Sequence, residues 1–481
     1  MDYDYDAKYL LSLVTRYDGY SRLAKQSRWG FFPGVSAGWV FSKEDFMEPL
    51  RDVVSFAKLR MSYGANGSLD AIGNYTVYGA YGNTTMYDGN NAILFTTLPS
   101  PGLLWEKSWT FETGLDMSFW QNRLNANVTY YNRHTSNKIA NITIPTHTGS
   151  GSLLSNNGEI MNQGVEFELS ARVVNSRDWK VNLALNGAYN VNKILKLPDN
   201  GLENNRQNAQ QVYDPSTGKL VWVGGLQEGQ RPGDIYGPLA LGIYASESEI
   251  PGNLVDKTSG NNGSNGRWLY GPTAWANATA AEKANGFPIQ PGDVIWKDVN
   301  EDGVIDNYDL VKLGNTMPKW TGGFTANIAW KGVSLMGRFD YALDYKVVDN
   351  VTPWIMGNMQ GTFNTISLVK DSYDVENNKM GKWPTYSWAD QLGKRNYARA
   401  NNSLFVYEGS YLAFREIQLA YDLPKALLGK VGIEKLQVYV SGQNLGYLTQ
   451  AGLLGTPEYG ANSWGSYRLP RTVIFGVNLT F

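Results

Sequence analysis

The chain has 481 residues and a net charge of −2, with 18% charged residues, which excludes the basic surface of a nucleic-acid-binding protein. No run of about 18 apolar residues occurs, so a transmembrane helix is excluded as well. Cysteine is absent, and the two histidines, His134 and His147, are too isolated for most metal or triad chemistry, so we expect no enzyme.

Strands are favoured by the composition, with 13% aromatic residues and 52 glycines. Apolar and polar residues alternate with a period of two in twelve stretches, each of which predicts a strand. These stretches are residues 9–17, 30–42, 56–63, 108–120, 124–132, 164–174, 179–192, 320–330, 333–343, 411–421, 436–445 and 471–481.

The alternation gives each predicted strand one apolar and one polar face. In residues 164–174, Val165 and Phe167 face one side, whereas Glu166 and Glu168 face the other. The last strand ends on its apolar face at Phe481. Asn, Thr, Ser, Glu and Arg dominate the polar faces, and Trp and Tyr lie near the strand ends. This distribution favours lipid outside and water inside.

Short and long connections alternate along the chain after an intermediate first connection. This order predicts an all-β, up-and-down antiparallel sheet with turns at one end and loops at the other, which is typical of an outer-membrane β-barrel. Residues 193–318 and 345–409 are expected to be long extracellular loop regions. A soluble β-sandwich or propeller is the alternative, but it would need apolar interior faces and a charged exterior.

Two short helical segments interrupt the strand pattern. Ser42 and Asp45, followed by Phe46, resemble a capping box that opens a helical turn, and Pro49 limits its length. A second helical segment is expected at residues 424–430.

A calcium-binding loop is predicted at residues 298–309. A calcium loop needs oxygen ligands at positions 1, 3, 5, 7, 9 and 12 and a glycine at position 6, here Gly303. The expected ligands are Asp298, Asn300, Asp302, the carbonyl of Val304, Asp306 and Asp309. The ion would be structural and would fix a long loop. The alternative is an Asp-, Asn- and Gly-rich turn without metal.

Other candidate residues have simpler explanations. Glu166 and Glu168, and likewise Arg338 and Asp340, share one strand face and are expected on the wall of the lumen rather than in an acid–base pair. The aromatic residues of the loops, such as Tyr78, Tyr81 and Trp354, are candidates for stacking on sugar rings. Membrane-interface girdles and loop packing are the alternative explanation.

Several stretches follow one another in the order known from one family. They include RYDGYSR at 16–22, WGFFPGVSAGW at 29–39, KLRMSYG at 58–64, FETGLD at 111–116, residues 161–167, residues 292–309, PKWTGGF at 318–324, residues 442–445 and the terminal Phe481. The chain thereby resembles the C-terminal half of the barrel of SusC/RagA-type TonB-dependent outer-membrane transporters of the Bacteroidota.

The resemblance implies about 12 strands of a 22-stranded barrel that imports oligosaccharide or peptide. It further implies a SusD-like surface lipoprotein as partner, energy from TonB–ExbB–ExbD, a periplasmic C-terminus and extracellular long loops. The alternative function is a surface attachment protein that uses the calcium loop as dockerins do, although a dockerin would show two such loops.

The resemblance also implies that family members are about twice as long. Residues 1–6, MDYDYD, are acidic and do not form a signal peptide, and neither a plug domain nor a TonB box is recognisable. TonB contact would require the missing N-terminal plug. We therefore expect the chain to be a fragment that does not transport solute alone.

Overall fold

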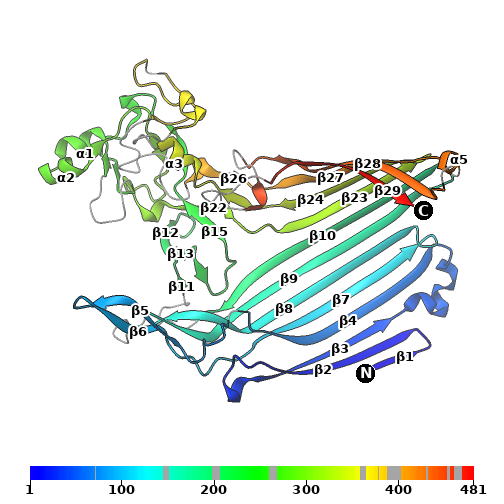
Figure 1. Cartoon of the computed structure of the whole chain (residues 1–481). Coiled ribbons are helices and arrows are strands. Elements are labelled where there is room, and N and C mark those ends of the chain that lie inside the picture. Colours follow the sequence, from blue (N-terminus) through cyan, green and yellow to red (C-terminus); the bar gives the residue numbers. More distant parts are fainter. Residues whose placement is uncertain are drawn as a thin grey trace.

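The computed structural model describes residues 1–70, 72–144, 151–197, 206–258, 268–357, 364–377, 379–386, 402–428, 432–451, 456–459 and 469–481. In this part of the chain a 13-stranded sheet curves around a central space (Figure 1). Its strands are β1 (Asp2–Tyr5), β2 (Tyr9–Gly19), β3 (Trp29–Trp39), β4 (Val54–Ser68), β7 (Glu106–Phe119), β8 (Leu124–Thr143), β9 (Ser152–Asn175), β10 (Trp179–Lys196), β23 (Trp320–Trp330), β24 (Val333–Leu343), β27 (Tyr411–Asp422), β28 (Lys435–Thr449) and β29 (Thr472–Thr480).

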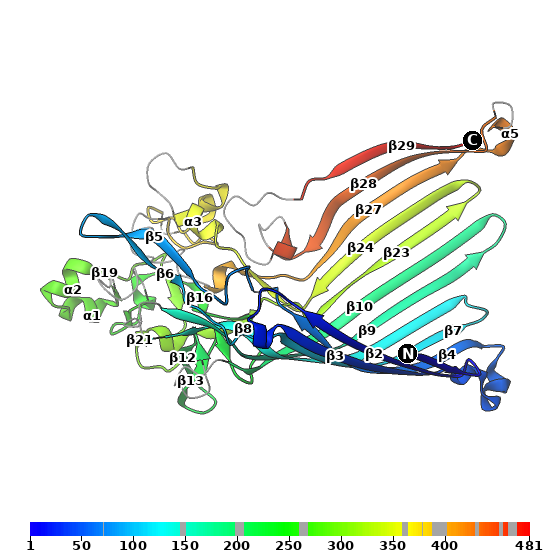
Figure 2. The same cartoon turned by 60° about the horizontal axis from the view of Figure 1, so that its bottom comes forward.

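Each strand of this sheet pairs antiparallel with the next one along the chain, and β1 and β29 are the edges. The connections 6–8, 40–53, 120–123, 176–178, 331–332 and 423–434 lie together at what we call the turn end. The longer connections, dominated by residues 69–105, 197–319 and 344–410, lie at the opposite loop end (Figures 1 and 2). The predicted up-and-down arrangement is confirmed.

The loop end contains many short elements. Residues 69–105 carry the hairpin β5 (Ala80–Tyr87) and β6 (Asn90–Thr97). Residues 197–319 carry β11 (Arg206–Gln207), β12 (Gln210–Asp214), β13 (Lys219–Val223), β14 (Leu226–Gln227), β15 (Asp234–Gly237), β16 (Ala240–Ile243), η5 (Glu247–Glu249), β17 (Val255–Asp256), β18 (Leu269–Tyr270), α1 (Pro272–Asn277), α2 (Ala280–Asn285), β19 (Phe287–Pro288), β20 (Val294–Trp296), β21 (Val304–Ile305), η6 (Asn307–Asp309) and β22 (Val311–Asn315).

Further short elements complete the fold. They are η1 (Lys25–Ser27), η2 (Phe41–Lys43), η3 (Asp45–Leu50), β25 (Lys346–Val348), α3 (Thr352–Gly357), η7 (Ser367–Asp371), η8 (Ser403–Phe405), β26 (Val406–Glu408), α5 (Lys425–Leu428) and η9 (Pro457–Tyr459). The helical segment expected at 424–430 corresponds to α5. No helix in the described ranges is both long and apolar enough to cross a membrane.

The sheet has one strand more than the twelve predicted. β1 pairs with β2 through a tight turn, with Tyr5 opposite Tyr9. Within the three-residue connection 6–8, Asp6 and Ala7 adopt positive φ angles of 55° and 49°, as the central residues of a type I′ turn do, and the Lys8 amide donates to the Tyr5 carbonyl at 3.1 Å. This turn could not be predicted, because residues 6–8 lack the usual Asn-Gly or Asp-Gly pair.

The strands also extend further at the loop end than predicted. A loop was expected after residue 132, but β8 has 20 residues and β9 has 24. Both exceed the 9–11 tilted residues that cross a bilayer, so the hairpin projects beyond the region that can be covered by lipid. Above that region both faces meet water, and the alternation of apolar and polar residues that marks a strand is lost.

The predicted capping box does not form. η3 begins after Glu44, which makes no side-chain capping bond. The carboxylate of Glu44 instead accepts hydrogen bonds from the Tyr9 hydroxyl at 2.7 Å and the Trp39 indole at 3.1 Å. Contacts with neighbouring strands therefore replace the local capping interaction at this turn.

The outer side of the sheet is apolar and carries aromatic pairs at both ends. Trp179 lies opposite Trp330 near the turn end, and Tyr189 lies opposite Trp320 near the loop end. Their ring centroids are 5.7 Å and 4.8 Å apart. The two pairs are ten positions apart on each strand. At about 3.3 Å per residue and about 45° tilt, this separation matches the roughly 25 Å apolar band of an outer-membrane barrel.

The buried hydrophobic clusters lie at the loop end and not over the outer side of the sheet. The largest is built within residues 197–319 and includes Tyr244, Leu269, Trp296 and Ile305. Another joins the β2–β3 and β4–β7 connections through Leu23, Leu69, Ile72, Val77, Leu103 and Ile139. On the outer side of the strands, in contrast, Leu335 and Phe475 keep 43% and 80% of their surface exposed. Lipid is the environment that suits such a face.

Candidate functional site

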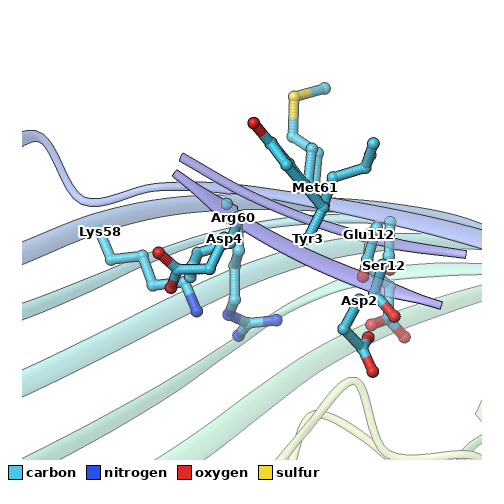
Figure 3. A pocket seen from close by; sticks show the side chains of 14 residues that line it. Asp2, Tyr3, Asp4, Ser12, Lys58, Arg60, Met61 and Glu112 are labelled. Carbon is cyan, nitrogen blue, oxygen red and sulfur yellow. The ribbon is translucent and has the colours of Figure 1, made fainter. Parts of the chain in front are cut away.

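The side of the sheet opposite the apolar face forms what we call the inner wall. Figure 3 shows Lys58, Arg60 and Asp2 pointing to this side, while Met61 and Tyr3 point away from it. A cavity of about 510 Å³ lies here, lined in part by Asp2, Asp4, Lys58, Arg60 and Glu112. Because successive side chains of a strand point to opposite faces, one face of the sheet becomes a water-facing wall with positive and negative side chains.

Arg60 is fixed on the inner wall by three neighbours. Its Nε lies 3.3 Å from Asp116 Oδ1, and its Nη2 lies 3.3 Å from Asn127 Oδ1 and also contacts Thr129 Oγ1. Gly114 makes room for the guanidinium, because a Cβ there would lie 2.7 Å from Arg60 Cζ. The guanidinium therefore reaches from β4 across β7 to β8 and lines two of the cavities on the inner wall.

The residues predicted for the lumen wall lie there. Glu166 and Glu168 line a cavity of about 420 Å³ together with Arg60. Arg338 and Asp340 line another of about 430 Å³. These cavities are open, polar and of mixed charge, which suits the passage of hydrated solutes better than tight binding of a single apolar ligand.

A bulge in β27 brings one further arginine to the inner wall. Arg338 pairs with Glu416 and Phe339 with Phe414, so Arg415 has no partner opposite it. A bulge of this kind redirects a side chain. Arg415 Nη2 lies 2.7 Å from Asp340 Oδ2 on the neighbouring strand, and Arg415 Nε contacts Asp340 Oδ1.

The guanidinium of Arg415 also holds a segment of the β28–β29 connection. Arg415 Nη1 lies 3.2 Å from Glu458 Oε1, and Nη2 contacts Glu458 Oε2. The hydroxyl of Tyr447 donates to Glu458 Oε1, and the hydroxyl of Tyr345 donates to the carbonyl of Pro457 at 3.1 Å. Residues 456–459 are thereby attached to the inner wall at the loop end.

Sequence reasoning did not single out Arg415, Glu458 or Arg60. One signal was present for Arg415: the apolar positions change parity between Phe414 and Ile417, which indicates a bulge. Glu458 could not be predicted to lie beside Arg415, because the two residues are 43 positions apart in the chain. Their contact depends on how the strands between them pair.

The predicted calcium loop lies in the region between β10 and β23. Val304 and Ile305 form β21, which pairs in parallel with β17. The carbonyls of Gly303 and Ile305 accept hydrogen bonds from Val255 and Lys257 at 3.0 Å and 2.8 Å. Because carbonyls alternate in direction along a strand, that of Val304 points to the other side, toward the loop.

Asp298, Asp302 and Asp306 each accept a hydrogen bond from a backbone amide of the loop, and Oδ2 of Asp302 also accepts one from the Asn300 side chain at 3.0 Å. Oδ2 of Asp298 accepts from Gly303 at 2.9 Å, Oδ1 of Asp302 from Val304 at 2.8 Å, and Oδ1 of Asp306 from Tyr308 at 2.8 Å. The remaining oxygen of Asp298, Oδ1, is buried and has no hydrogen-bond partner among the residues that the structure describes. A buried carboxylate oxygen without a donor fits a cation ligand.

Asp309 closes the loop from its far end. It is 1% exposed, and its oxygens accept from the amides of Val299 and Asp306 at 2.7 Å and 2.8 Å. Burial raises the pKa of Asp309. Within the described ranges, no three Asp, Glu, His or Cys side chains converge closely enough to hold a metal alone. A cation would therefore also need the Asn300 amide and the Val304 carbonyl.

The aromatic loop residues differ in accessibility. Tyr78 is 65% exposed. Tyr81 has one ring face against Phe95, with centroids 4.2 Å apart, so only its other face is available for stacking. The side chain of Trp354 lies outside the described residues. Sugar stacking remains a prediction for Tyr78 and for the open face of Tyr81.

Ser36 and His134, two groups of the described residues that could suggest an enzyme, lie on strands of the large sheet. The pattern Gly-x-Ser-x-Gly occurs at residues 34–38, but this stretch lies within β3, where Ser36 is opposite Ser12 and Ser62. A hydrolase nucleophile of this pattern requires a strand-to-helix turn. His134 Nε2 lies 3.1 Å from Glu159 Oε2, and His147 is outside the described residues.

Comparison with known proteins identifies the architecture. The family described as TonB dependent receptor-like, beta-barrel matches residues 1–445. The chain belongs to this family. A TonB-dependent receptor of Formosa agariphila is 26% identical over 498 residues, an alignment that covers 100% of this chain and 45% of the receptor. The TonB-dependent receptor SusC of Bacteroides thetaiotaomicron is 30% identical over 204 residues, which cover 41% of this chain and 20% of SusC.

The solved structures agree in fold with this TonB-dependent receptor barrel. The RagAB peptide transporter superposes with a TM-score of 0.73 at 23% identity, covering 100% of this chain and 47% of that chain. The predicted resemblance to SusC/RagA-type receptors is confirmed for the barrel portion. The chain spans about half the length of the curated relatives it matches, 45% in the case of the Formosa agariphila receptor.

Proposed function

We propose that the protein carrying this chain imports nutrient solutes, oligosaccharide or peptide, across the bacterial outer membrane. The observation that carries this proposal is the sheet itself, with an apolar outer face, a polar inner wall and the long connections at one end. A lipid-embedded wall around a wet lumen is what a solute importer of this family needs. The energy would come from TonB–ExbB–ExbD through a plug domain outside this chain.

The same asymmetry supports the orientation proposed from the sequence. The turn end, with α5 and Phe481, would face the periplasm, and the long loops of residues 197–319 and 344–410 would be extracellular. A SusD-like surface lipoprotein would cover the loop end. The peptide transport named for RagAB supports peptide as one substrate class, and oligosaccharide is the other class that the family resemblance of the sequence implies.

Calcium would have a structural role in this proposal. An ion bound by Asp298, Asn300, Asp302, Val304, Asp306 and Asp309 would attach β21 and η6 to the core formed by Tyr244, Trp296 and Ile305. The support is the orphaned Oδ1 of Asp298. A second loop of this kind, as attachment through a dockerin would require, is not recognisable in the sequence.

Uptake by whole cells tests the proposed function. A strain that lacks the gene should lose growth on, and uptake of, one labelled oligosaccharide or peptide pool, and the intact gene should restore both. Orientation is tested separately, because the chain has no cysteine. Tyr87 lies in the β5–β6 hairpin and is 80% exposed. The variant Tyr87→Cys should react with a membrane-impermeant thiol reagent on whole cells. Normal uptake of every solute by the deletion strain would contradict import.

A further inference from the structure

The connection between β3 and β4, residues 40–53, presents an apolar surface at the turn end of the sheet. Phe46 and Leu50 of η3 are 62% and 49% exposed, and Val53 just after them is 43% exposed. Val40 and Met47 are buried, whereas the larger apolar groups of η3 stay uncovered. We call this segment the β3–β4 turn (the blue helical turns at the ends of β3 and β4 in Figure 1).

The β3–β4 turn folds back onto the apolar outer side of the sheet. The rings of Phe41 and Phe46 lie 5.6 Å and 6.2 Å from the ring of Trp39. Trp39 is at the end of the outward-facing series of β3, directly opposite the outward-facing Tyr9 of β2. The exposed apolar groups of the turn are therefore continuous with the lipid-facing surface and are separated from the inner wall by the sheet.

Glu44 holds the turn in this position. Its Oε1 accepts hydrogen bonds from the Tyr9 hydroxyl at 2.7 Å and the Trp39 indole at 3.1 Å, and its Oε2 lies 3.3 Å from Lys8 Nζ. The hydrogen bond from Tyr9 is the main reason that the pKa of Glu44 is lowered, so the carboxylate stays ionised near neutral pH. Tyr and Trp donors that fix a polar group beside exposed apolar rings are typical of the boundary between lipid and water.

We propose that the β3–β4 turn is a membrane anchor whose Phe46, Leu50 and Val53 insert into the phospholipid leaflet on the turn side. The turn lies at the end of the sheet marked by the exposed Trp120 and by the Trp179–Trp330 pair, which is the depth at which aromatic side chains meet lipid headgroups. Lys43, Glu48 and Arg51 of the turn supply the polar side that such an amphipathic segment needs. The inference rests on the proposed membrane location and adds a lipid contact outside the strands.

Spin labels can measure the depth of the turn. The chain contains no cysteine, so Phe46→Cys and Leu50→Cys introduce single labelling sites into it. Glu48→Cys is the matched control, since this side chain is 73% exposed on the polar side of the same turn. Leu335→Cys, on the outer face of β24, is the lipid control. The intact protein would be reconstituted in vesicles of phosphatidylethanolamine and phosphatidylglycerol.

Collision with oxygen, which concentrates in lipid, and with a water-soluble nickel chelate gives the exposure of each nitroxide. Labels at 46 and 50 should show an oxygen-to-nickel ratio several-fold higher than the label at 48 and closer to that at 335. Ratios at 46 and 50 equal to that at 48, with 335 still in lipid, would overturn the anchor. A label at 335 that is accessible to nickel would instead overturn the proposed membrane location, and the anchor with it.

A further variant tests the role of Glu44. In a Glu44→Ala background the three bonds to Tyr9, Trp39 and Lys8 are lost, and the nitroxide at 46 should move faster and at a less defined depth. An unchanged spectrum would overturn the assignment of Glu44 as the residue that positions the turn. The lipid contact itself would still be decided by the collision measurement.

Discussion

Arg415 of β27 and Glu458 of the β28–β29 connection form an ion pair with two contacts at the loop end of the inner wall. Asp340 engages the same guanidinium from β24, so one cation joins two carboxylates. The side chains of Arg415 and Glu458 are 18% and 21% exposed. The pair is thus partly shielded from water, and it decides where residues 456–459 lie.

Arg415→Met should release this segment. The change leaves Asp340 and Glu458 close together without a cation between them, which we expect to cost about 1–3 kcal/mol of local stability. A loss of this size corresponds to roughly 5–150-fold faster hydrogen exchange when the exchange follows local opening. Exchange at the amides of residues 456–459, measured by mass spectrometry on the intact protein, checks this expectation.

Arg338→Met is the matched control on the same wall. Arg338 is 60% exposed and lies 3.5 Å from Glu416, so its pair is solvent-screened and its loss should cost less than about 1 kcal/mol. Exchange of residues 456–459 should stay as in the unsubstituted protein. Equal acceleration in both variants would show that general loss of positive charge, and not the Arg415–Glu458 pair, controls the segment.

The strands of the membrane-spanning region were predictable from the sequence because each has lipid on one side and water on the other. Val165 and Glu166 could be assigned to opposite faces from that rule alone, and the structure places Glu166 at the inner cavity. The rule fails where both faces meet the same solvent. For this reason the extension of β8 to Thr143 was missed.

The candidate site was predictable where its residues are close together in the chain. It was not predictable where strand pairing brings distant residues together. The loop from Asp298 to Asp309 could be read from spacing alone. The inward turn of Arg415 depends on a bulge against two strands, and the position of Glu44 depends on Tyr9 and Trp39. Long-range contacts of this type leave almost no trace in a single sequence.

Calcium should protect residues 298–309 from exchange. At a calcium concentration about 100 times the dissociation constant, binding stabilises the bound form by about 2.7 kcal/mol. Asp298→Ala removes the orphaned Oδ1 and should abolish most of the protection. The measurement compares hydrogen exchange of amides 299–309 in CaCl2 and in EDTA, and terbium luminescence excited through Tyr308 reports binding directly.

Asp214→Ala provides the control for an acidic turn outside the calcium loop. Asp214 accepts a hydrogen bond from the Ser216 amide at 2.9 Å. The aspartates of the calcium loop accept hydrogen bonds from backbone amides of their loop in the same way. Its removal should loosen the β12–β13 turn without changing the response of residues 298–309 to calcium. If CaCl2 and EDTA give the same exchange in the unsubstituted protein, the loop is a turn without metal.

Tyr244 should make the loop-end core sensitive to alkali. Burial raises the pKa of Tyr244 to about 12, with Asp256 and Asp293 adding to the effect, whereas an unfolded tyrosine has a pKa of about 10. The native state therefore keeps a proton that the unfolded state loses between these values. The stability that Tyr244 contributes is complete below pH 10 and falls by about 2 kcal/mol as the pH rises to 12.

Tyr244→Phe removes this titration. We expect the variant to resemble the unsubstituted protein at pH 8 and to be the more stable of the two at pH 11–12, as measured by thermal unfolding in detergent. Tyr75→Phe, a change at a tyrosine that is 75% exposed, controls for the loss of a hydroxyl group. If the thermal stability of the unsubstituted protein and of Tyr244→Phe changes with pH in the same way, the expected effect of burial is contradicted.

Leu185→Lys, compared with the same substitution at the neighbouring Ala184, should show which face of β10 meets lipid. Leu185 lies on the outer side of β10, midway between the aromatic pairs of Trp179 and Tyr189, and is 37% exposed. A lysine near the middle of the apolar band of a barrel costs about 2–4 kcal/mol. The neighbouring Ala184 faces the inner wall because side chains alternate along a strand, so Ala184→Lys adds the same charge on the wet side. Urea titration of the intact protein in vesicles, with folding followed by heat-modifiable gel migration, should show a loss of stability for Leu185→Lys and little change for Ala184→Lys. The reverse order, or equal effects, would mean that the apolar face of β10 does not meet lipid, and the membrane orientation of the whole sheet would have to be abandoned.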